Sequence, residues 1–201
     1  MSPRGVAIEG LRERLFAAAD RVLAREGAAA LTSRAVTEEA GCAKGVLHTH
    51  FASLDQFVAE LVLHHFKAAA AVSEDLPARA GAGEVGDNLA GVASAVLSLD
   101  PGLVGLAVTR PAAAQRVREA WEAGAPGFAA IENAVGGYLR AEQDLGRVAA
   151  AVDVESAALA LVGTLHHLLM TGPADATAAS QAQVERLVRA LIGASRTPGA
   201  P

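Results

Sequence analysis

The sequence predicts an all-α protein. Alanine and leucine, both strong helix formers, dominate its 201 residues. Apolar residues recur every three or four positions through most of the chain, and no segment shows the alternating pattern of a half-buried β-strand. Hydrophobic residues make up 52% of the chain and charged residues 19%, which is the composition of a folded globular protein with a substantial core.

Residues that end helices divide this pattern into segments. The first expected helix covers residues 8–26, with Leu11, Leu15 and Val22 on one apolar face, and Gly27 ends it. Thr32 is a suitable N-cap for the second helix. The remaining expected helices cover residues 33–40, 44–50, a longer segment from residue 54, and then 86–98, 102–120, 126–144, 153–171 and 177–194.

Charge is distributed unevenly along the chain. The first 67 residues carry eight basic and eight acidic side chains, whereas the remainder carries nine basic and 14 acidic ones and accounts for the net charge of −5. This balance excludes a uniformly basic coat of the kind that binds nucleic acid over a whole surface. The N-terminal part is therefore the part whose electrostatics suit a polyanion.

One N-terminal segment has the layout of a helix-turn-helix. It runs over residues 31–51 and reads LTSRAVTEEAGCAKGVLHTHF. Val36 on the first short helix, and Leu47 and Phe51 on the second, form apolar faces that can pack together. Small residues at Ala40 and Gly41 allow the two helices to cross closely. Such a unit places its second helix in the DNA major groove.

The side chains left outside this packing suit contacts to DNA. Lys44 stands at the expected start of the second helix, where it can meet a phosphate, and Gly45 permits close approach of the backbone. Val46 can contact a thymine methyl group, and Thr49 a base edge or phosphate. The residues predicted to contact DNA are Thr32, Ser33, Arg34, Ala43, Lys44, Gly45, Val46, His48, Thr49 and His50.

Residues 9–66 resemble the N-terminal domain of the tetracycline-repressor (TetR) family. The first helix contains the small residues and aromatic of that family, as LFAAA over 15–19, and a glycine follows at Gly27. The second helix starts at a threonine and ends in Ala40-Gly41. The family's recognition segment, SKGTLYxHF, reads AKGVLHTHF over 43–51, and SLD over 53–55 follows where the fourth helix begins. Order and spacing are kept without a gap.

Three departures from the family pattern fall in the recognition segment. Ala43 replaces the usual serine and removes a side-chain N-cap, at a cost of roughly 0.5–2 kcal/mol of local stability. His48 stands in place of a tyrosine and Val46 in place of a threonine. These changes leave the expected fold intact and bear on the operator sequence and on affinity.

The resemblance implies a regulator with two functional domains. We expect a DNA-binding domain over 1–53, a helical ligand-binding and dimerisation domain over 54–196, and a disordered tail over 197–201. The family has a cavity between its long fourth helix and its middle helices, and an apolar cavity suits a small hydrophobic effector that releases the protein from its operator. The expected lining residues are His65, Phe66, Leu97, Leu103, Leu106, Trp121, Phe128, Tyr138 and His166.

The resemblance also implies a homodimer. Family members pair through their last two long helices, and two recognition helices set about one DNA turn apart require a twofold partner. The predicted interface residues are Leu161, Leu165, Leu168, Val184, Leu187, Val188 and Leu191. The alternative is that these apolar faces fill the core of their own chain.

Cysteine content and hydropathy bear on location. Cys42 is the single cysteine, so a disulfide within the chain is impossible and a reducing cytosol is the natural setting. The N-terminus lacks the apolar run of a signal peptide. The apolar run 157–170 is shorter than the roughly 20 residues that span a bilayer, and we interpret it as a buried helix. We therefore expect a cytoplasmic protein without a membrane partner.

Other signals favour structural explanations. Neighbouring histidines on a helix point about 100° apart, so neither His64-His65 nor His166-His167 can readily chelate a metal alone. The motif GAGEVG over 81–86 does not follow a strand and is interpreted as an interhelical loop. No cofactor, metal or enzymatic activity is expected. Two other classes stay open: a helical carrier or enzyme that uses the histidines, and a protein-interaction module with a degenerate helix-turn-helix.

Overall fold

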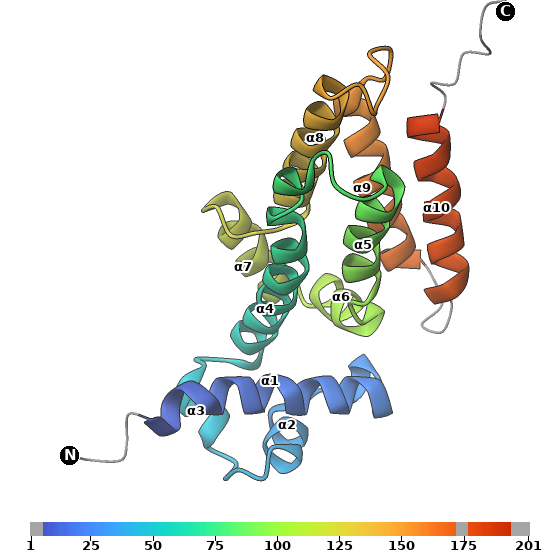
Figure 1. The fold of residues 1–201 in the computed structure, drawn as a ribbon. Coiled ribbons are helices and arrows are strands. Elements are labelled where there is room, and N and C mark those ends of the chain that lie inside the picture. Colours follow the sequence, from blue (N-terminus) through green and yellow to red (C-terminus); the bar gives the residue numbers. More distant parts are fainter. Residues whose placement is uncertain (1–5, 172–176, 194–201) are drawn as a thin grey trace, which may run out of the picture. The chain divides into compact units, whose positions relative to one another are not determined.

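The structure is a computed structural model that describes residues 6–171 and 177–193 (Figure 1). Within these ranges the regular elements are helices and no strand occurs, so the predicted all-α class is confirmed. The elements are α1 (Val6–Glu26), η1 (Ala28–Ala30), α2 (Ser33–Glu39), α3 (Val46–His50), α4 (Leu54–Glu74), η2 (Pro77–Arg79), α5 (Val85–Leu97), α6 (Pro101–Thr109), α7 (Pro111–Glu122), α8 (Phe128–Asp144), α9 (Val154–Thr171) and α10 (Thr177–Gly193).

One predicted helix is wrong. The segment expected as a single helix over 102–120 is two helices, α6 and α7, separated at Arg110. Pro111 causes the break, because proline disfavours helical backbone in the residue before it, and Arg110 has φ −115° and ψ 93°. Pro111 then occupies the first turn of α7, where its missing N–H costs nothing. The short 3-10 helices η1 and η2 were not predicted either.

The chain packs as two compact units. The first contains the described residues up to His64 together with Gly102–Ala123, and the second contains His65–Pro101 and the described residues from Gly124 onward. Helix α4 contributes its first half to one unit and its second half to the other. The expected boundary between a DNA-binding and a ligand-binding domain after residue 53 is a functional one and stays a prediction. The boundary between the two packed units falls within α4, after His64. The expected tail over 197–201 lies outside the described residues.

The core of the first unit is built on one face of α1. Leu15, Ala18, Ala19 and Val22 are buried at helical spacing, as the sequence predicts. Phe16 joins an aromatic group in which its ring lies 6.1 Å from that of Phe51 and 5.6 Å from that of Phe57. The rings of Phe51 and Phe57 meet edge to face at 5.0 Å. This group joins α1, the end of α3 and the start of α4.

A capping motif fixes where α4 begins. The Ser53 hydroxyl accepts a hydrogen bond from the backbone N–H of Gln56 at 3.1 Å. The Gln56 side chain in turn accepts from the backbone N–H of Ala52 at 2.9 Å. This arrangement is close to a capping box, which satisfies the unpaired N–H groups at a helix start. It holds the beginning of α4 directly after the recognition segment.

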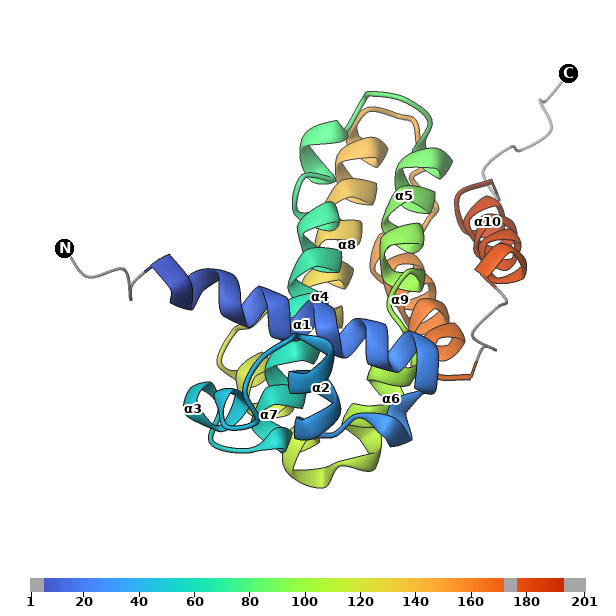
Figure 2. The ribbon, with the colours of Figure 1, turned by 90° about the horizontal axis from the view of Figure 1, so that it is seen from below.

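The second unit is a group of packed helices (Figure 2). α8 packs on α9, α9 packs on α5, and α10 packs on both α5 and α9. α9 is long and apolar enough to cross a membrane by length and composition alone. Its residues Ala157, Ala158, Leu161, Val162, Leu165 and Leu169 are nevertheless buried in this unit. One face of α9 is therefore part of the core of this unit, as predicted, and the rest of the helix is not buried.

A polar network ties the loop before α5 to α8. The Glu142 side chain is fully buried, accepts from the backbone N–H of Gly81 at 3.2 Å, and lies 3.2 Å from Nε of Arg147. Asn88 donates to the Tyr138 hydroxyl at 2.9 Å and to the carbonyl of Ala82 at 2.8 Å. Burial raises the pKa of Tyr138 to about 12, so this hydroxyl stays neutral. Residues 81–84 of the glycine-rich motif thus form an interhelical loop, as predicted, whereas Val85 and Gly86 already belong to α5.

Removing the carboxylate from this network should destabilise the fold. We expect Glu142→Ala to lower the free energy of unfolding by about 2–4 kcal/mol, because it leaves Arg147 without its charge partner and the Gly81 N–H without an acceptor. Asp144→Ala, which removes an exposed carboxylate from the same helix, should change it by less than about 0.5 kcal/mol. Urea unfolding followed by circular dichroism measures both values. Equal effects of the two substitutions would contradict the structural role of Glu142.

Candidate DNA-binding surface

The start of α2 is set by Thr32. Its hydroxyl oxygen accepts a hydrogen bond from the backbone N–H of Ala35 at 3.1 Å, which confirms the predicted N-cap. Thr37, further along α2, is fully buried, and its hydroxyl bonds to the carbonyls of Ser33 at 2.9 Å and Arg34 at 3.1 Å. A buried polar group is therefore satisfied within the helix.

The turn after α2 is a Schellman motif centred on Gly41. Gly41 has φ +67°, a left-handed conformation that favours glycine. Its N–H donates to the carbonyl of Glu38 at 3.1 Å, and the N–H of Cys42 donates to the carbonyl of Thr37 at 2.8 Å. These two bonds satisfy the last carbonyls of α2 and reverse the chain toward α3.

The recognition helix α3 starts later than predicted. Its regular part is Val46–His50, whereas a start at residue 44 was expected. Gly45 is the N-cap and no side chain caps the helix, because Ala43 has no oxygen to offer. A turn in which the N–H of Val46 donates to the carbonyl of Ala43 at 2.9 Å leads into it. Ala43, Lys44 and Gly45 therefore lie in the exposed turn before the helix.

The apolar faces of α2 and α3 are buried as the sequence predicts. Val36 and Leu47 are fully buried, and Phe51, directly after α3, is 1% exposed. These residues pack within the first unit and are unavailable to DNA. The opposite side of each helix is consequently the side that faces solvent.

Three arginines on α1 contact the end of α2 and the turn that follows it. Arg21 and Arg25 bind the two oxygens of Glu39 at 2.6 and 2.9 Å, and these hydrogen bonds, that of Arg21 foremost, lower the pKa of the carboxyl from its ordinary value of 4.5. Arg14 donates to the carbonyl of Ala40 at 3.2 Å and to Sγ of Cys42 at 3.8 Å. These contacts were not predicted from the sequence. The spacing of seven and four residues, which places the arginines on one helical face, was the available signal.

Most of the predicted DNA-contacting residues are accessible. Thr32, Arg34, Ala43, Lys44, Gly45, His48 and Thr49 are exposed, while Ser33, Val46 and His50 are half-buried. Arg34 pairs with Glu38 one helical turn away at 2.7 Å. Exposed pairs of this kind contribute little stability, so Arg34 can exchange its carboxylate for a phosphate at small cost. The surface thus presents several cationic or donor side chains, and the charge of nearby Glu39 is paired with Arg21 and Arg25.

The residues predicted to bind an effector do not line one cavity within a unit. The first unit contains Leu103, Leu106 and Trp121, and the second contains His65, Phe66, Leu97, Phe128, Tyr138 and His166. In the second unit the Phe128 ring lies 4.9 Å from that of Phe66 and 5.0 Å from that of His166. Tyr138 is fully buried in the helical core. The effector pocket as a whole stays a prediction.

Four of the predicted interface residues are buried within the protomer, which is the alternative that the sequence left open, and the interface itself stays a prediction. Leu161, Leu165, Val184 and Val188 are at most 2% exposed and belong to the core of the second unit. Leu168, Leu187 and Leu191 are only partly buried against it. The apolar faces therefore fill their own core first, because α10 packs against α5 and α9 of the same chain. Leu159 and Met170 on α9, with 59% and 40% exposed surface, were not foreseen.

The histidines and the cysteine make local contacts. The His64 ring lies 5.1 Å from that of Phe16, and Nε2 of His167 lies 3.4 Å from the Thr171 hydroxyl. Among the described residues no three histidine, cysteine or acidic side chains gather as metal ligands would. Cys42 is a half-buried turn residue.

Comparisons with known proteins agree with this surface. Residues 15–61 match the sequence pattern of the family described as bacterial regulatory proteins, tetR family. Salmonella enterica GusR shares the fold with a TM-score of 0.66 at 17% identity, over 92% of this chain and 96% of that one. The TetR-family transcriptional regulator PfmR from Thermus thermophilus has a TM-score of 0.60 at 18% identity, over 88% of this chain and 97% of that one.

A third solved structure contains a bound ligand. The transcriptional regulator FadR from Bacillus subtilis, in complex with stearoyl-CoA, has a TM-score of 0.59 at 21% identity, over 88% of this chain and 97% of that one. No curated protein sequence matches the chain significantly.

The fold and the exposed helix-turn-helix define a DNA-binding transcriptional regulator. Residues 15–61 match the DNA-binding domain of the TetR family, and the described chain shares its fold with a solved TetR-family regulator.

The left-handed backbone of Gly41 gives a direct test of the turn. A Cβ added at Gly41 meets no heavy atom within 4 Å, so Gly41→Ala introduces backbone strain without a clash. We expect it to lower the free energy of unfolding by about 1–2 kcal/mol. Gly10→Ala on α1, which also meets no atom within 4 Å, should raise stability by about 0.5–1 kcal/mol. Thermal unfolding monitored by circular dichroism distinguishes the two, and a neutral Gly41→Ala would refute the strained turn.

Proposed function

We propose that the protein is a cytoplasmic repressor that binds its operator as a homodimer and is released by a small hydrophobic effector. The exposure of the predicted contact residues on α2, α3 and the turn between them carries the DNA-binding part of this proposal. Because the apolar faces of both helices are buried, the exposed side can enter a major groove without losing core contacts.

Lys44 offers the sharpest test of the DNA contact, because the chain contains one other lysine, Lys67, for a matched control. Both are exposed, and Lys67 lies on α4 outside the helix-turn-helix. We expect Lys44→Ala to weaken binding to any sequence and to reduce the slope of log K against log salt by about 1, as loss of one phosphate contact requires. Lys67→Ala should bind as the wild type does.

Fluorescence anisotropy with DNA from the protein's own promoter region, against scrambled competitor, measures these effects. The same comparison is made with DNA fragments selected from the genome for binding. If scrambled DNA competes as well as the specific fragment for the wild type in both cases, the protein is not a sequence-specific regulator. That result would favour an interaction module with a degenerate helix-turn-helix.

The dimer is proposed to use the outer face of α9. Leu159 and Met170 are large apolar side chains exposed to solvent, and they lie 11 residues apart, about three helical turns, on one face. Half-buried Leu168, Leu187 and Leu191 on α9 and α10 can add to the interface. Together α9 and α10 of two protomers would form a four-helix contact. This twofold arrangement is what two half-sites on DNA require.

A charge in this face should separate the protomers. We expect Leu159→Asp to shift the protein from dimer to monomer in sedimentation velocity, because an unpaired carboxylate would be buried on association. Leu145 is 57% exposed at the end of α8 and serves as a control of matched exposure. Leu145→Asp should leave the dimer intact. A dimer that tolerates Leu159→Asp would place the interface elsewhere.

The effector is proposed to bind among the helices of the second unit. The adjoining rings of Phe66, Phe128 and His166 supply an aromatic group for a hydrophobic molecule. The stearoyl-CoA in the structurally similar FadR supports a long apolar ligand. Release follows by linkage, since a ligand that prefers the form unable to bind DNA lowers operator affinity. Loss of the anisotropy signal identifies such a molecule.

A further inference from the structure

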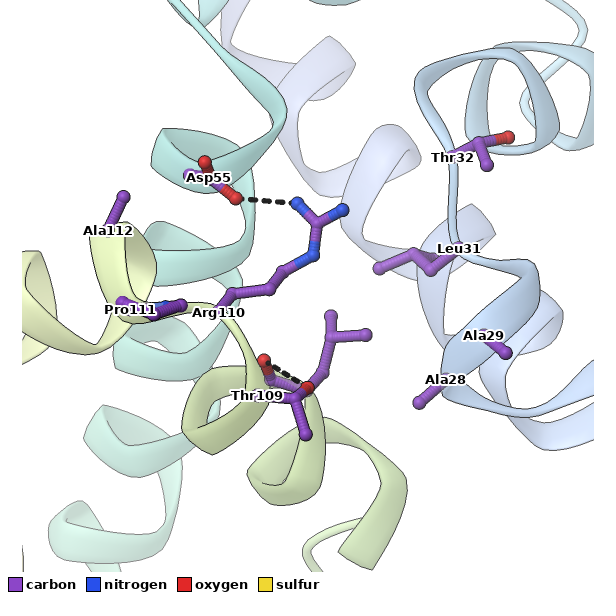
Figure 3. Close-up of a pocket in the computed structure, with 10 residues that line it drawn as sticks. Ala28, Ala29, Leu31, Thr32, Asp55, Thr109, Arg110, Pro111 and Ala112 are labelled. Atoms are coloured by element: carbon purple, nitrogen blue, oxygen red, sulfur yellow. Dashed lines mark hydrogen bonds and ion pairs between the residues drawn. The ribbon is translucent and has the colours of Figure 1, made fainter.

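The first unit contains a cavity of about 870 Å³ (Figure 3). It lies between the segment that leads from η1 into α2, the first turn of α4, and the junction of α6 with α7. Its volume falls in the range of small-molecule sites. Of the predicted effector residues, Leu106 alone is among its described lining residues, so this cavity is distinct from the proposed effector site.

The lining of this cavity is divided by chemistry. An apolar part consists of Ala28 and Ala29 of η1, Ala112, Pro111, Leu31 and Leu106. Leu31 and Leu106 are 2% and 4% exposed. A polar part consists of Thr32, Thr109, Asp55 and Arg110. A ligand that fits both parts has an apolar body and one polar head.

Arg110 is the central polar group. Figure 3 shows its side chain extending from the α6–α7 junction, with Asp55 on one side and Leu31 and Thr32 across the cavity. Nη1 donates to Oδ1 of Asp55 at 2.5 Å. A guanidinium carries five N–H donors, and among the described residues this one has no second acceptor. The side chain keeps 31% of its surface exposed. Unused donors therefore face the cavity.

Thr32 adds a further donor. Its oxygen already accepts the N–H of Ala35 as the N-cap of α2, so its own hydrogen remains to be donated. The charges of Asp55 and Arg110 offset each other, and the N-terminal end of α4 adds a partial positive charge beside Asp55. The cavity therefore offers more hydrogen-bond donors than acceptors, which favours a ligand with an anionic head.

We propose that this cavity binds a small amphipathic monocarboxylate. The carboxylate lies against Arg110, whose planar fork matches two carboxylate oxygens, and the apolar body lies on Leu31, Leu106 and Pro111. This site is additional to the proposed effector site, and its existence does not depend on DNA binding.

Occupation of the site has a structural consequence. The ligand carboxylate competes with Asp55 for Arg110, and the repulsion between the two carboxylates weakens the ion pair. That pair ties the α6–α7 junction to the first turn of α4, two residues after the Ser53 cap. The ligand thus acts on the segment that directly follows the recognition helix.

The test uses the full-length protein without DNA, with octanoate as the probe and its neutral and cationic counterparts octanamide and octylamine as comparisons. Backbone amide shifts of Ala28, Ala29, Thr109 and Ala112 in NMR titrations locate the site. We expect octanoate to move these resonances, and octanamide to bind about tenfold or more weakly, since the charge-assisted hydrogen bonds are lost. Arg110→Gln should weaken octanoate binding by a similar factor.

Arg118→Gln is the matched control, because Arg118 lies on α7 outside the cavity and bonds to Gln115. It should leave octanoate binding unchanged. If Arg110→Gln does not fold, the comparison of octanoate with octanamide on the wild type decides. Equal binding of the two, shifts elsewhere on the chain, or preferential binding of octylamine that Asp55→Asn removes would each overturn the proposal. Because DNA is absent, none of these results bears on operator binding.

Discussion

The helix-turn-helix depends on the reversal of the chain at Gly41, where a left-handed backbone lets two hydrogen bonds close the end of α2. With the turn fixed, Val36, Leu47 and Phe51 are all buried, and the polar sides of α2 and α3 are left to solvent. α3 has five residues and lacks a side-chain cap, so it has little stability of its own. Its position therefore comes from this packing and from the arginines of α1 that hold Glu39 and Ala40.

Polar contacts at the ends of helices also fix the position of short segments elsewhere in the chain. Ser53 and Gln56 satisfy the start of α4, and Glu142 with Arg147 holds the loop before α5. In each case a short irregular segment, which buries little apolar surface, is fixed by a few hydrogen bonds to a long helix. Such segments are where the placement of functional side chains is decided, because the long helices are already specified by their apolar faces.

The two proposed ligand sites lie in different units of the chain. The aromatic group of Phe66, Phe128 and His166 belongs to the second unit, and the cavity beside Arg110 belongs to the first. α4 is continuous through both units and starts three residues after Phe51. A ligand at either proposed site would therefore act on the helix that follows the predicted recognition helix α3. Coupling of this kind requires only that the ligand binds the DNA-binding form and the form unable to bind DNA with different affinities.

The sequence by itself determined the helical class, most helix positions and the DNA-reading segment. Helical periodicity, glycine stops and the Thr32 cap are local signals, and local signals can be read along a chain. The tertiary structure decided what periodicity cannot. It broke the expected helix over 102–120 at Pro111, turned Leu161, Leu165, Val184 and Val188 into the protomer's own core, and brought Arg110 to Asp55 across 55 positions of sequence. An apolar face shows that a helix is buried, but the packing of the whole chain selects its partner, because any apolar surface of suitable shape satisfies the same hydrophobic requirement.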